Sequence, residues 1–318
     1  MNKNNRHEIA MALQDTAGPI YITSHNSPDG DAIGSMLGLT WALKAMGKTV
    51  YPVLIDDVPN NLLFLPGTEW IQKPDNIGVP DEGVLVSVDV SGRTRMNVPL
   101  NWRLPIFIID HHSTGKSAEG LIWCEPEATA TGELIEELIR EELNLEMTPE
   151  IANCLYLAIA SDSGFFKYSN TTPKALRLAA SLVEAGAEPN FISENFEIRS
   201  FYTLTRLAEI LKSIEIHWNG WLTEMTIVSL PEDEPGFSDG FVDFPRSIST
   251  AQVSVLYKVI DSSTIRISLR SKGPNVASVA EKLGGGGHYR AAGLTFDGTL
   301  EEAKEKVHQE LRCLMLEE

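Results

Sequence analysis

Hydrophobic positions in the first part of the chain fall into short, nearly continuous runs. Four runs predict strands: residues 19–24 (PIYITS), 49–55 (TVYPVLI), 83–89 (GVLVSVD) and 104–110 (LPIFIID). Such runs are typical of parallel strands that are covered on both faces. Longer segments with apolar residues at helical spacing predict helices over 31–46, 130–143, 149–161 and 173–185. The pattern predicts an α/β domain with a central parallel sheet flanked by helices, ending near residue 190.

The remainder of the chain has a different pattern. An amphipathic helix is expected over 200–213, and TIRISLR (264–270) alternates apolar and polar residues as a hairpin strand does. The other expected elements are strands at 221–230, 251–260 and 292–296, helices at 275–283 and 299–316, and a GGGGH loop at 284–288. These elements predict a smaller α+β domain. We expect a first domain over 1–190, a linker over 191–205 and a second domain over 206–318.

Composition and charge narrow the class of protein. The chain has 318 residues, enough for about two domains at roughly 150 residues each. Its 26 basic and 44 acidic residues give a formal net charge of −18, and no block rich in Lys or Arg is present. Proteins that grip long duplexes use a basic stripe to displace counterions from many phosphates, so a long nucleic acid is disfavoured. A small anionic substrate at a locally positive site stays open.

The sequence also bears on the cellular compartment. The longest apolar candidate, residues 151–161, is about half of the ~20 residues that span a bilayer. The first residues, MNKNNRHEIAMALQ, lack the apolar stretch of a secretory signal. We therefore expect a cytoplasmic protein that does not bind membranes. Cys124, Cys154 and Cys313 fit neither a disulfide framework nor a C-x-x-C zinc site, and we expect them in the core.

Acidic and imidazole side chains gather where the predicted strands end. SHNSPDGDAIGS follows the first strand and places His25, Asp29 and Asp31 in one segment. The other candidates end a strand or an apolar helix: Asp89, Asp110, His111, His112 and Asp162. In parallel α/β sheets, ligands bind beyond the carboxyl ends of the strands. We therefore expect these side chains to face one crevice.

Each residue taken singly has a plain structural interpretation. Asp31 suits a helix N-cap, Asp29-Gly30 suits a turn, and residues 110–112 suit a surface turn. Asp162 could end a helix without a role, although a carboxylate there opposes the helix dipole. Taken together, these interpretations leave five carboxylates in mutual repulsion. Shared divalent cations would remove that repulsion.

The ligand types narrow the metal. Carboxylates mixed with imidazoles and no thiolate favour Mn²⁺, with Mg²⁺ and Zn²⁺ as alternatives. Two ions roughly 3.5–4 Å apart would need a bridging carboxylate and could hold a hydroxide between them. Such a pair suits attack by water on phosphorus, because one side activates the water and the other neutralises charge on the phosphoryl oxygens.

The ordered segments SHNSPDGDAIGS, VSVD, IIDHHS and ASDSG resemble the four motifs of the DHH phosphoesterase family. NVASVAEKLGGGGHYRAAG resembles the glycine-rich signature of the associated C-terminal domain. The resemblance covers nearly the whole chain and, with its length, points to the NrnA-type branch of RecJ-like proteins. Members of that branch are cytoplasmic, two-domained and Mn²⁺-dependent nanoRNases and phosphoadenosine phosphatases. The resemblance thus implies a catalytic domain followed by a substrate-binding domain.

The resemblance also implies a role for each motif residue. Two ligand sets would share Asp89, namely His25, Asp29 and Asp89 for one ion, and Asp31, Asp89, His111 and Asp162 for the other. His112 would lie beside the scissile phosphate, binding it or assisting protonation of the leaving group. Asp110 would orient an imidazole, as carboxylates behind metal ligands do.

The glycine-rich segment of the second domain is a candidate anion site. Consecutive glycines such as Gly286 and Gly287 can offer backbone N–H groups because no side chain blocks close approach. A flexible loop is the plain alternative, but the adjoining His288 and Arg290 and the resemblance favour anion binding. Arg270 is a further cation for a phosphate, with an ordinary exposed strand residue as its alternative.

These inferences predict a Mn²⁺-dependent phosphoesterase acting on short RNA oligonucleotides and on adenosine 3′,5′-bisphosphate (PAP). Both reactions expel a ribose 3′-oxygen from phosphorus, so one site can perform either. The expected partners are short oligoribonucleotides or small adenine nucleotides, and a homodimer is open. Hydrolysis of cyclic di-AMP or pApA is the alternative, followed by a nucleotide sensor without turnover. Exonuclease action on long strands and pyrophosphatase activity are disfavoured, because those relatives have different accessory domains.

Overall fold

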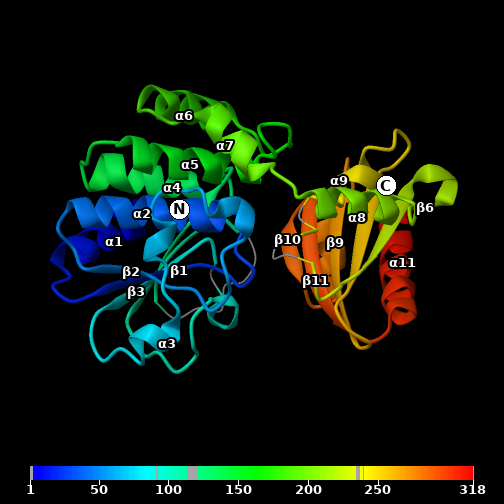
Figure 1. Cartoon of the computed structure of the whole chain (residues 1–318), viewed down its shortest axis with the longest axis horizontal. Helices are drawn as coiled ribbons and strands as arrows, with labels where there is room; N and C mark the ends of the chain where they lie inside the picture. The colour runs from blue at the N-terminus through cyan, green and yellow to red at the C-terminus, as the bar shows by residue number, and fades with distance from the viewer. Residues whose placement is uncertain (1–2, 91, 113–119, 234–236, 239, 318) are drawn as a thin grey trace. The chain divides into compact units, whose positions relative to one another are not determined.

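The computed structural model describes residues 3–90, 92–112, 120–233, 237–238 and 240–317 (Figure 1). The chain divides into two compact units, Met1–Ile198 and Arg199–Glu318. The first contains a five-stranded parallel sheet and the second a separate mixed sheet, so the expected fold class is confirmed. The expected domain limits and linker stay a prediction. Helix α7 (Pro189–Phe196) overlaps the start of the segment that we expect to be the linker.

The sheet of the first unit has the strand order β2-β1-β3-β4-β5, with every neighbouring pair parallel. Its strands are β1 (Ile20–Thr23), β2 (Val50–Pro52), β3 (Val84–Val88), β4 (Ile106–Asp110) and β5 (Leu121–Cys124). The first four are the predicted strands. The fifth strand, β5, is not among the predicted elements; its apolar run is only four residues long.

Helices cover one face of this sheet. They are α1 (Lys3–Asp15), α2 (Gly30–Ala45), α4 (Thr131–Glu137) with its π-helical extension η4 (Leu138–Glu142), and α5 (Pro149–Asp162), with α6 (Pro173–Glu184) and α7 beyond (Figure 1). Ile20 and Val86 pack on this helical side, whereas Tyr21 and Leu85, one position away, pack with Trp102 on the other. The shorter elements are η1 (Asn60–Leu62), η2 (Thr68–Trp70), α3 (Pro74–Ile77) and η3 (Arg93–Arg95). Helices α1 and α7 are not among the predicted elements.

Close packing of α2 on α5 positions two of the candidate ligands. Gly30, Gly34 and Gly38 recur every four residues on α2 and face α5. A Cβ at Gly34 would lie 2.4 Å from the carbonyl oxygen of Cys154, and one at Gly30 would lie 2.6 Å from Ser161 Cβ. Only glycine permits this approach. The contact brings the start of α2 beside the end of α5, where Asp31 and Asp162 lie.

The sheet of the second unit has the strand order β10-β11-β9-β8-β7-β6. Its strands are β6 (Glu215–His217), β7 (Leu222–Val228), β8 (Val253–Val259), β9 (Thr264–Ser271), β10 (Gly286–His288) and β11 (Ala291–Asp297). Only β7 and β8, among these neighbours, pair in parallel. The helical elements are α8 (Phe201–Leu211), η5 (Trp218–Gly220), α9 (Asp243–Arg246), α10 (Val276–Lys282) and α11 (Leu300–Glu317). One face packs on α8 and the other on α10 and α11.

Some expectations need correction. Residues 284–288 are not wholly a loop, since β10 begins at Gly286. Gly287 has φ of +143°, and a Cβ there would lie 2.5 Å from the carbonyl oxygen of Ala291, so this glycine lets β10 pair closely with β11. Cys154 is buried as expected, but Cys313 is exposed because it lies on the outer side of α11. None of the described helices combines the length and apolar character needed to cross a bilayer.

Candidate metal centre

The carboxyl edge of the parallel sheet brings the predicted ligands together. His25 follows β1, Asp89 follows β3 and His111 follows β4. Asp89 has φ of +60°, a left-handed conformation that non-glycine residues rarely adopt. This turn leaves the Asp89 side chain only 3% exposed, within the cluster instead of the solvent. Strained backbone of this kind concentrates at functional sites.

The first group of ligand atoms consists of His25, Asp29 and Asp89. His25 Nε2 lies 3.3 Å from Asp89 Oδ2 and 3.7 Å from Asp29 Oδ1. The other ring nitrogen, Nδ1, lies 2.9 Å from the carbonyl oxygen of Asn26, which orients the imidazole. Asp29, and not Asp31, is the N-cap of α2, since its Oδ1 accepts a 3.1 Å hydrogen bond from the Ala32 N–H. The plain interpretation of Asp31 as the N-cap is therefore wrong.

The second group surrounds His111. Its Nε2 lies 3.4 Å from Asp89 Oδ1, 3.4 Å from Asp162 Oδ2 and 3.6 Å from Asp31 Oδ2. Its Nδ1 lies 3.2 Å from the carbonyl oxygen of Ala128. The two oxygens of Asp89 thus face different groups, Oδ2 the first and Oδ1 the second. This is the placement that a carboxylate bridging two cations requires.

The charges of this cluster conflict in the absence of a cation. Burial, the largest influence, and the charge of Asp89 raise the pKa of Asp31 well above its usual value. Burial also raises the pKa of Asp162 to about 6, against the opposing effect of His111. Burial acts in the same direction on Asp89, but hydrogen bonds from His111 and His25 hold its pKa well below the usual value. A divalent cation would stabilise all three carboxylates in their ionised form.

A layer of donors that we do not predict from the sequence holds the carboxylates. Thr131 Oγ1 donates to Asp89 Oδ1 at 3.0 Å. The backbone N–H groups of Thr131 and Gly132, in the first turn of α4, donate to Asp31 at 2.7 and 3.0 Å. Ser35 Oγ donates to Asp31 Oδ1 at 2.8 Å. The positive end of α4 therefore faces the site. A Thr-Gly pair opening a predicted helix is the available signal, but it is a weak one.

Asn97 supports the His25 segment from outside every motif. It is fully buried, and its Nδ2 donates to the carbonyl oxygen of His25 at 3.2 Å. Its Oδ1 accepts hydrogen bonds of 3.0 Å from the N–H groups of Ile55 and Asp56. The side chain thus connects the segments that follow β1 and β2. Nothing in the local sequence distinguishes this asparagine from one in an ordinary loop.

Asp110 and His112 form a pair at the edge of the cluster. His112 Nδ1 lies 2.8 Å from Asp110 Oδ1, and the His112 N–H donates to the same oxygen at 3.1 Å. His112 Nδ1 is also 3.6 Å from Asp89 Oδ1. Asp110 is fully buried, so it holds the orientation of the His112 ring from within the protein.

The candidate substrate residues of the second unit lie on and between β9, β10 and β11. Arg270 pairs with Ala291, which pairs in turn with His288, so Arg270 and His288 project from the same face of the sheet. Arg290 is exposed between β10 and β11. The N–H groups of Gly284 and Gly285 donate to the carbonyls of Glu281 and Ala280 in α10, whereas Gly286 and Gly287 lie in β10, which pairs with β11.

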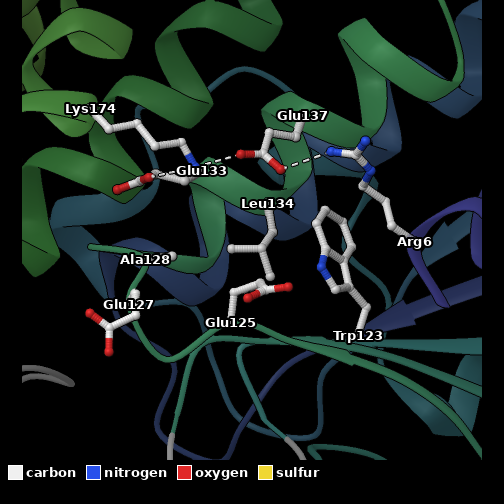
Figure 2. A pocket seen from close by; sticks show the side chains of 9 residues that line it. All are labelled: Arg6, Trp123, Glu125, Glu127, Ala128, Glu133, Leu134, Glu137 and Lys174. Carbon is white, nitrogen blue, oxygen red and sulfur yellow. Dashed lines mark hydrogen bonds and ion pairs between the residues drawn. The ribbon is translucent and has the colours of Figure 1, made fainter. Parts of the chain in front are cut away.

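A pocket of about 280 Å³ lies in the first unit, and no predicted metal ligand lines it. Figure 2 shows Lys174 and Arg6 reaching Glu137 from opposite sides. Four glutamates line the pocket: Glu125, Glu127, Glu133 and Glu137. Because these carboxylates outnumber the two cations, the pocket disfavours a phosphate ligand. We assign no substrate to it.

Comparisons with known proteins show the family of this chain. The model of the DHH family, N-terminal domain, matches residues 19–159, and that of the DHHA1 domain matches residues 224–313. The bifunctional oligoribonuclease and PAP phosphatase NrnA of Thermus thermophilus is 36% identical over 96% of this chain and 92% of its own length. The chain belongs to the DHH family. The predicted resemblance is confirmed.

Other similar proteins are less identical to this chain. The cyclic-di-AMP phosphodiesterase PdeA of Listeria monocytogenes is 27% identical over 94% of this chain, but the match covers only 48% of PdeA. An exopolyphosphatase-related protein from Bacteroides fragilis has a crystal structure that matches with a TM-score of 0.83 at 25% identity, covering 98% of this chain and 96% of that one. The fold of that structure therefore matches both units of this chain.

Proposed function

We propose that this protein is a phosphoesterase dependent on two divalent ions that hydrolyses short oligoribonucleotides and removes the 3′-phosphate of PAP. The observation that carries the proposal is the position of Asp89, whose two oxygens face separate groups of ligands. A similar relative over nearly its whole length is named an oligoribonuclease and PAP phosphatase, which supports the substrate class.

The donor set fits a pair of hard divalent cations. His25, Asp29 and Asp89 would hold one ion, and Asp31, Asp89, His111 and Asp162 the other. Carboxylate oxygens with imidazole and no thiolate suit Mn²⁺, with Mg²⁺ and Zn²⁺ as alternatives. When bound, such ions activate water and neutralise charge on phosphoryl oxygens.

The remaining residues would position and protonate the substrate. Asp110 holds Nδ1 of His112, so we assign Nε2 of His112 to the scissile phosphate or to protonation of the leaving 3′-oxygen. In the second unit, Arg270, His288, Arg290 and the N–H groups of Gly286 and Gly287 would bind the anionic remainder of the substrate. The net charge of −18 would repel long polyanions and favour short ones.

Hydrolysis of cyclic di-AMP or pApA is the weaker candidate. The relative PdeA, named a cyclic-di-AMP phosphodiesterase, is less similar to this chain, and its match covers only about half of PdeA. Both substrates present ribose phosphodiesters to a site of the same chemistry. The two proposals are therefore distinguished by comparing hydrolysis rates on the two classes of substrate, and not by the fold.

One kinetic panel tests the proposal. The purified chain, stripped with chelator and reloaded with Mn²⁺, Mg²⁺ or Zn²⁺, is assayed with a diribonucleotide, PAP, pApA, cyclic di-AMP and a long single-stranded RNA. We expect turnover of the diribonucleotide and PAP, highest with Mn²⁺, and rates that fall steeply with RNA length. Inertness toward both substrates would overturn the assignment. Faster turnover of cyclic di-AMP would put the second candidate first.

A further inference from the structure

A second group of imidazole and carboxylate side chains lies in the C-terminal unit. Glu215 and His217 come from β6, Glu224 from β7 and His308 from α11. Glu215 and Glu224 are direct partners in the β6–β7 ladder. Like charges at paired positions destabilise two strands unless a cation neutralises them. Lys304 Nζ lies 3.0 Å from Glu215 Oε1 and neutralises the first carboxylate.

Glu224 is the buried centre of this group. Its side chain is 1% exposed. His308 Nε2 lies 2.7 Å from its Oε1, and the Tyr257 hydroxyl donates to the same oxygen at 2.7 Å. Burial, the largest influence, acts to raise the pKa of Glu224, but the hydrogen bonds from His308 and Tyr257 lower it below its usual value. An ionised carboxylate at this depth needs a cation as partner.

Two atoms of the group face each other without a hydrogen bond. Glu224 Oε2 and His217 Nε2 are 3.0 Å apart and buried. Among the described residues, neither atom has a hydrogen-bond partner. Glu215 Oε2 lies 3.4 Å from the same His217 nitrogen. Buried polar atoms this close together without a hydrogen bond need either a protonated imidazole, which makes them an ion pair, or a bound ion between them.

We propose that His217, Glu224 and His308 bind a Zn²⁺ ion, with Glu215 or water completing the coordination. Ligands at about 2.0–2.2 Å from a tetrahedral zinc ion stand about 3.3–3.6 Å from one another. The 3.4 Å contact between His217 Nε2 and Glu215 Oε2 matches that spacing, and the contacts of 2.7 and 3.0 Å from the two imidazoles to Glu224 would lengthen to admit the ion. Two imidazoles with one or two carboxylates suit zinc better than the harder Mn²⁺ or Mg²⁺.

The surroundings suit a structural ion. The ion would link β6, at the edge of the sheet, and the next strand β7 to α11, whose His308 lies 84 residues beyond Glu224. The His217 and His308 side chains are 29% and 24% exposed, whereas His217 Nε2 itself is buried, so the ion would lie beneath the two rings. Tyr257 orients the Glu224 carboxylate from within the core, as hydrogen bonds behind metal ligands do.

Zinc stoichiometry tests the proposal in the full chain. The parent, the double variant His217→Gln/His308→Gln and the control His7→Gln are dialysed against Zn²⁺, and their metal content is measured. His7 is a 66% exposed histidine paired with Glu142 in the first unit. Because the DHH centre can also bind zinc, the readout is the difference in zinc content per chain between the three proteins. We expect the double variant to bind one ion per chain fewer than both other proteins. Equal zinc in all three would overturn the proposal.

A measurement on the unaltered chain does not depend on how the variants fold. Nitrogen-15 spectra of the histidine rings are recorded during titration with Zn²⁺. We expect the Nε2 signals of His217 and His308 to move to metal-bound positions at about one equivalent beyond that taken by the DHH centre. If both nitrogens instead keep the signals of a hydrogen-bonded N–H at excess zinc, the group is a His–Glu–His network and the proposal is wrong.

Discussion

The two groups of metal-type ligands differ in composition and in how they are held. In the first unit, four carboxylates surround two imidazoles, and Asp89 lies between two sets of atoms. In the second unit, one buried carboxylate, Glu224, faces two imidazoles. Oxygen-rich sites with a shared carboxylate suit a pair of ions that meet a substrate. A nitrogen-rich, enclosed site suits one ion with a structural role. The same residue types thus suit different metal sites, depending on the ratio of carboxylates to imidazoles and on the hydrogen bonds that hold them.

Replacing Asp89 with Ala should have the largest effect, because it removes the carboxylate that we propose both ions share. We expect hydrolysis of a diribonucleotide to fall by about a thousand-fold or more, equal to about 4 kcal/mol in the activation barrier. Zinc bound by the His217–Glu224–His308 group should stay. The measurement is the steady-state rate at saturating Mn²⁺.

The matched control is Asp57→Ala, which removes a 78% exposed carboxylate paired with Lys73. It should keep the parent rate. A nucleotide sensor would show no activity to lose in the parent. If Asp89→Ala hydrolyses the diribonucleotide as fast as the parent does, the shared-ligand arrangement is wrong.

The contrast between the two groups explains what the sequence could reveal. Three of the proposed ligands of the first centre follow apolar strands. Because parallel strands must bring their carboxyl ends to one edge, His25, Asp89 and His111 can be predicted to meet. His308 is 84 residues from Glu224 and reaches it only through the docking of α11 on the sheet. Asn97 and Thr131 likewise act through contacts that no local pattern encodes. Long-range packing, and not residue type, is the missing information.

The two groups also differ in the packing that holds them. The first depends on the close glycine contacts between α2 and α5, whereas the second depends on the pairing of β6 with β7 and on one helix, α11. Gly34→Ala would place a methyl group 2.4 Å from a backbone oxygen. We expect the first unit to lose about 1–3 kcal/mol of stability toward unfolding. Hydrolysis should fall too, because Asp31 and Asp162 lie on the two helices that would separate.

Urea denaturation monitored by circular dichroism measures this change. Gly273→Ala is the matched control, since a Cβ there would meet nothing within 4 Å. Zinc binding in the second unit should be the same in both variants. An unchanged unfolding transition in Gly34→Ala would show that α2 and α5 can separate slightly at no cost.

A hydroxyl supports a carboxylate in each group, which permits a direct comparison. Thr131 donates to Asp89 in the first, and Tyr257 donates to Glu224 in the second. We expect Thr131→Val to weaken the apparent affinity for Mn²⁺ by about 10–100-fold, with the rate at saturating metal close to that of the parent. Tyr257→Phe should weaken zinc binding instead and leave the Mn²⁺ dependence unchanged.

Thr131→Ser keeps the donor and should restore the affinity for Mn²⁺. Metal titrations of activity and of zinc content supply both readouts. If Thr131→Val and the parent need the same Mn²⁺ concentration for half-maximal activity, the hydroxyl does not position Asp89.

The smallest effect should come from replacing Arg270. This replacement tests whether the second unit binds substrate, independently of the structural zinc ion that we propose there. Arg270→Gln removes a charge that could bind phosphate, and charge-assisted hydrogen bonds contribute about 1.5–3 kcal/mol. We expect KM for the diribonucleotide to rise by about tenfold or more, kcat to change little and zinc content to stay constant. In the structure, Arg270 Nη1 donates to the carbonyl oxygen of Leu269 at 3.0 Å. An unchanged KM together with a lower free energy of unfolding would mean that Arg270 contributes only through this backbone contact. The second unit would then bind the substrate through His288, Arg290 and the N–H groups of β10.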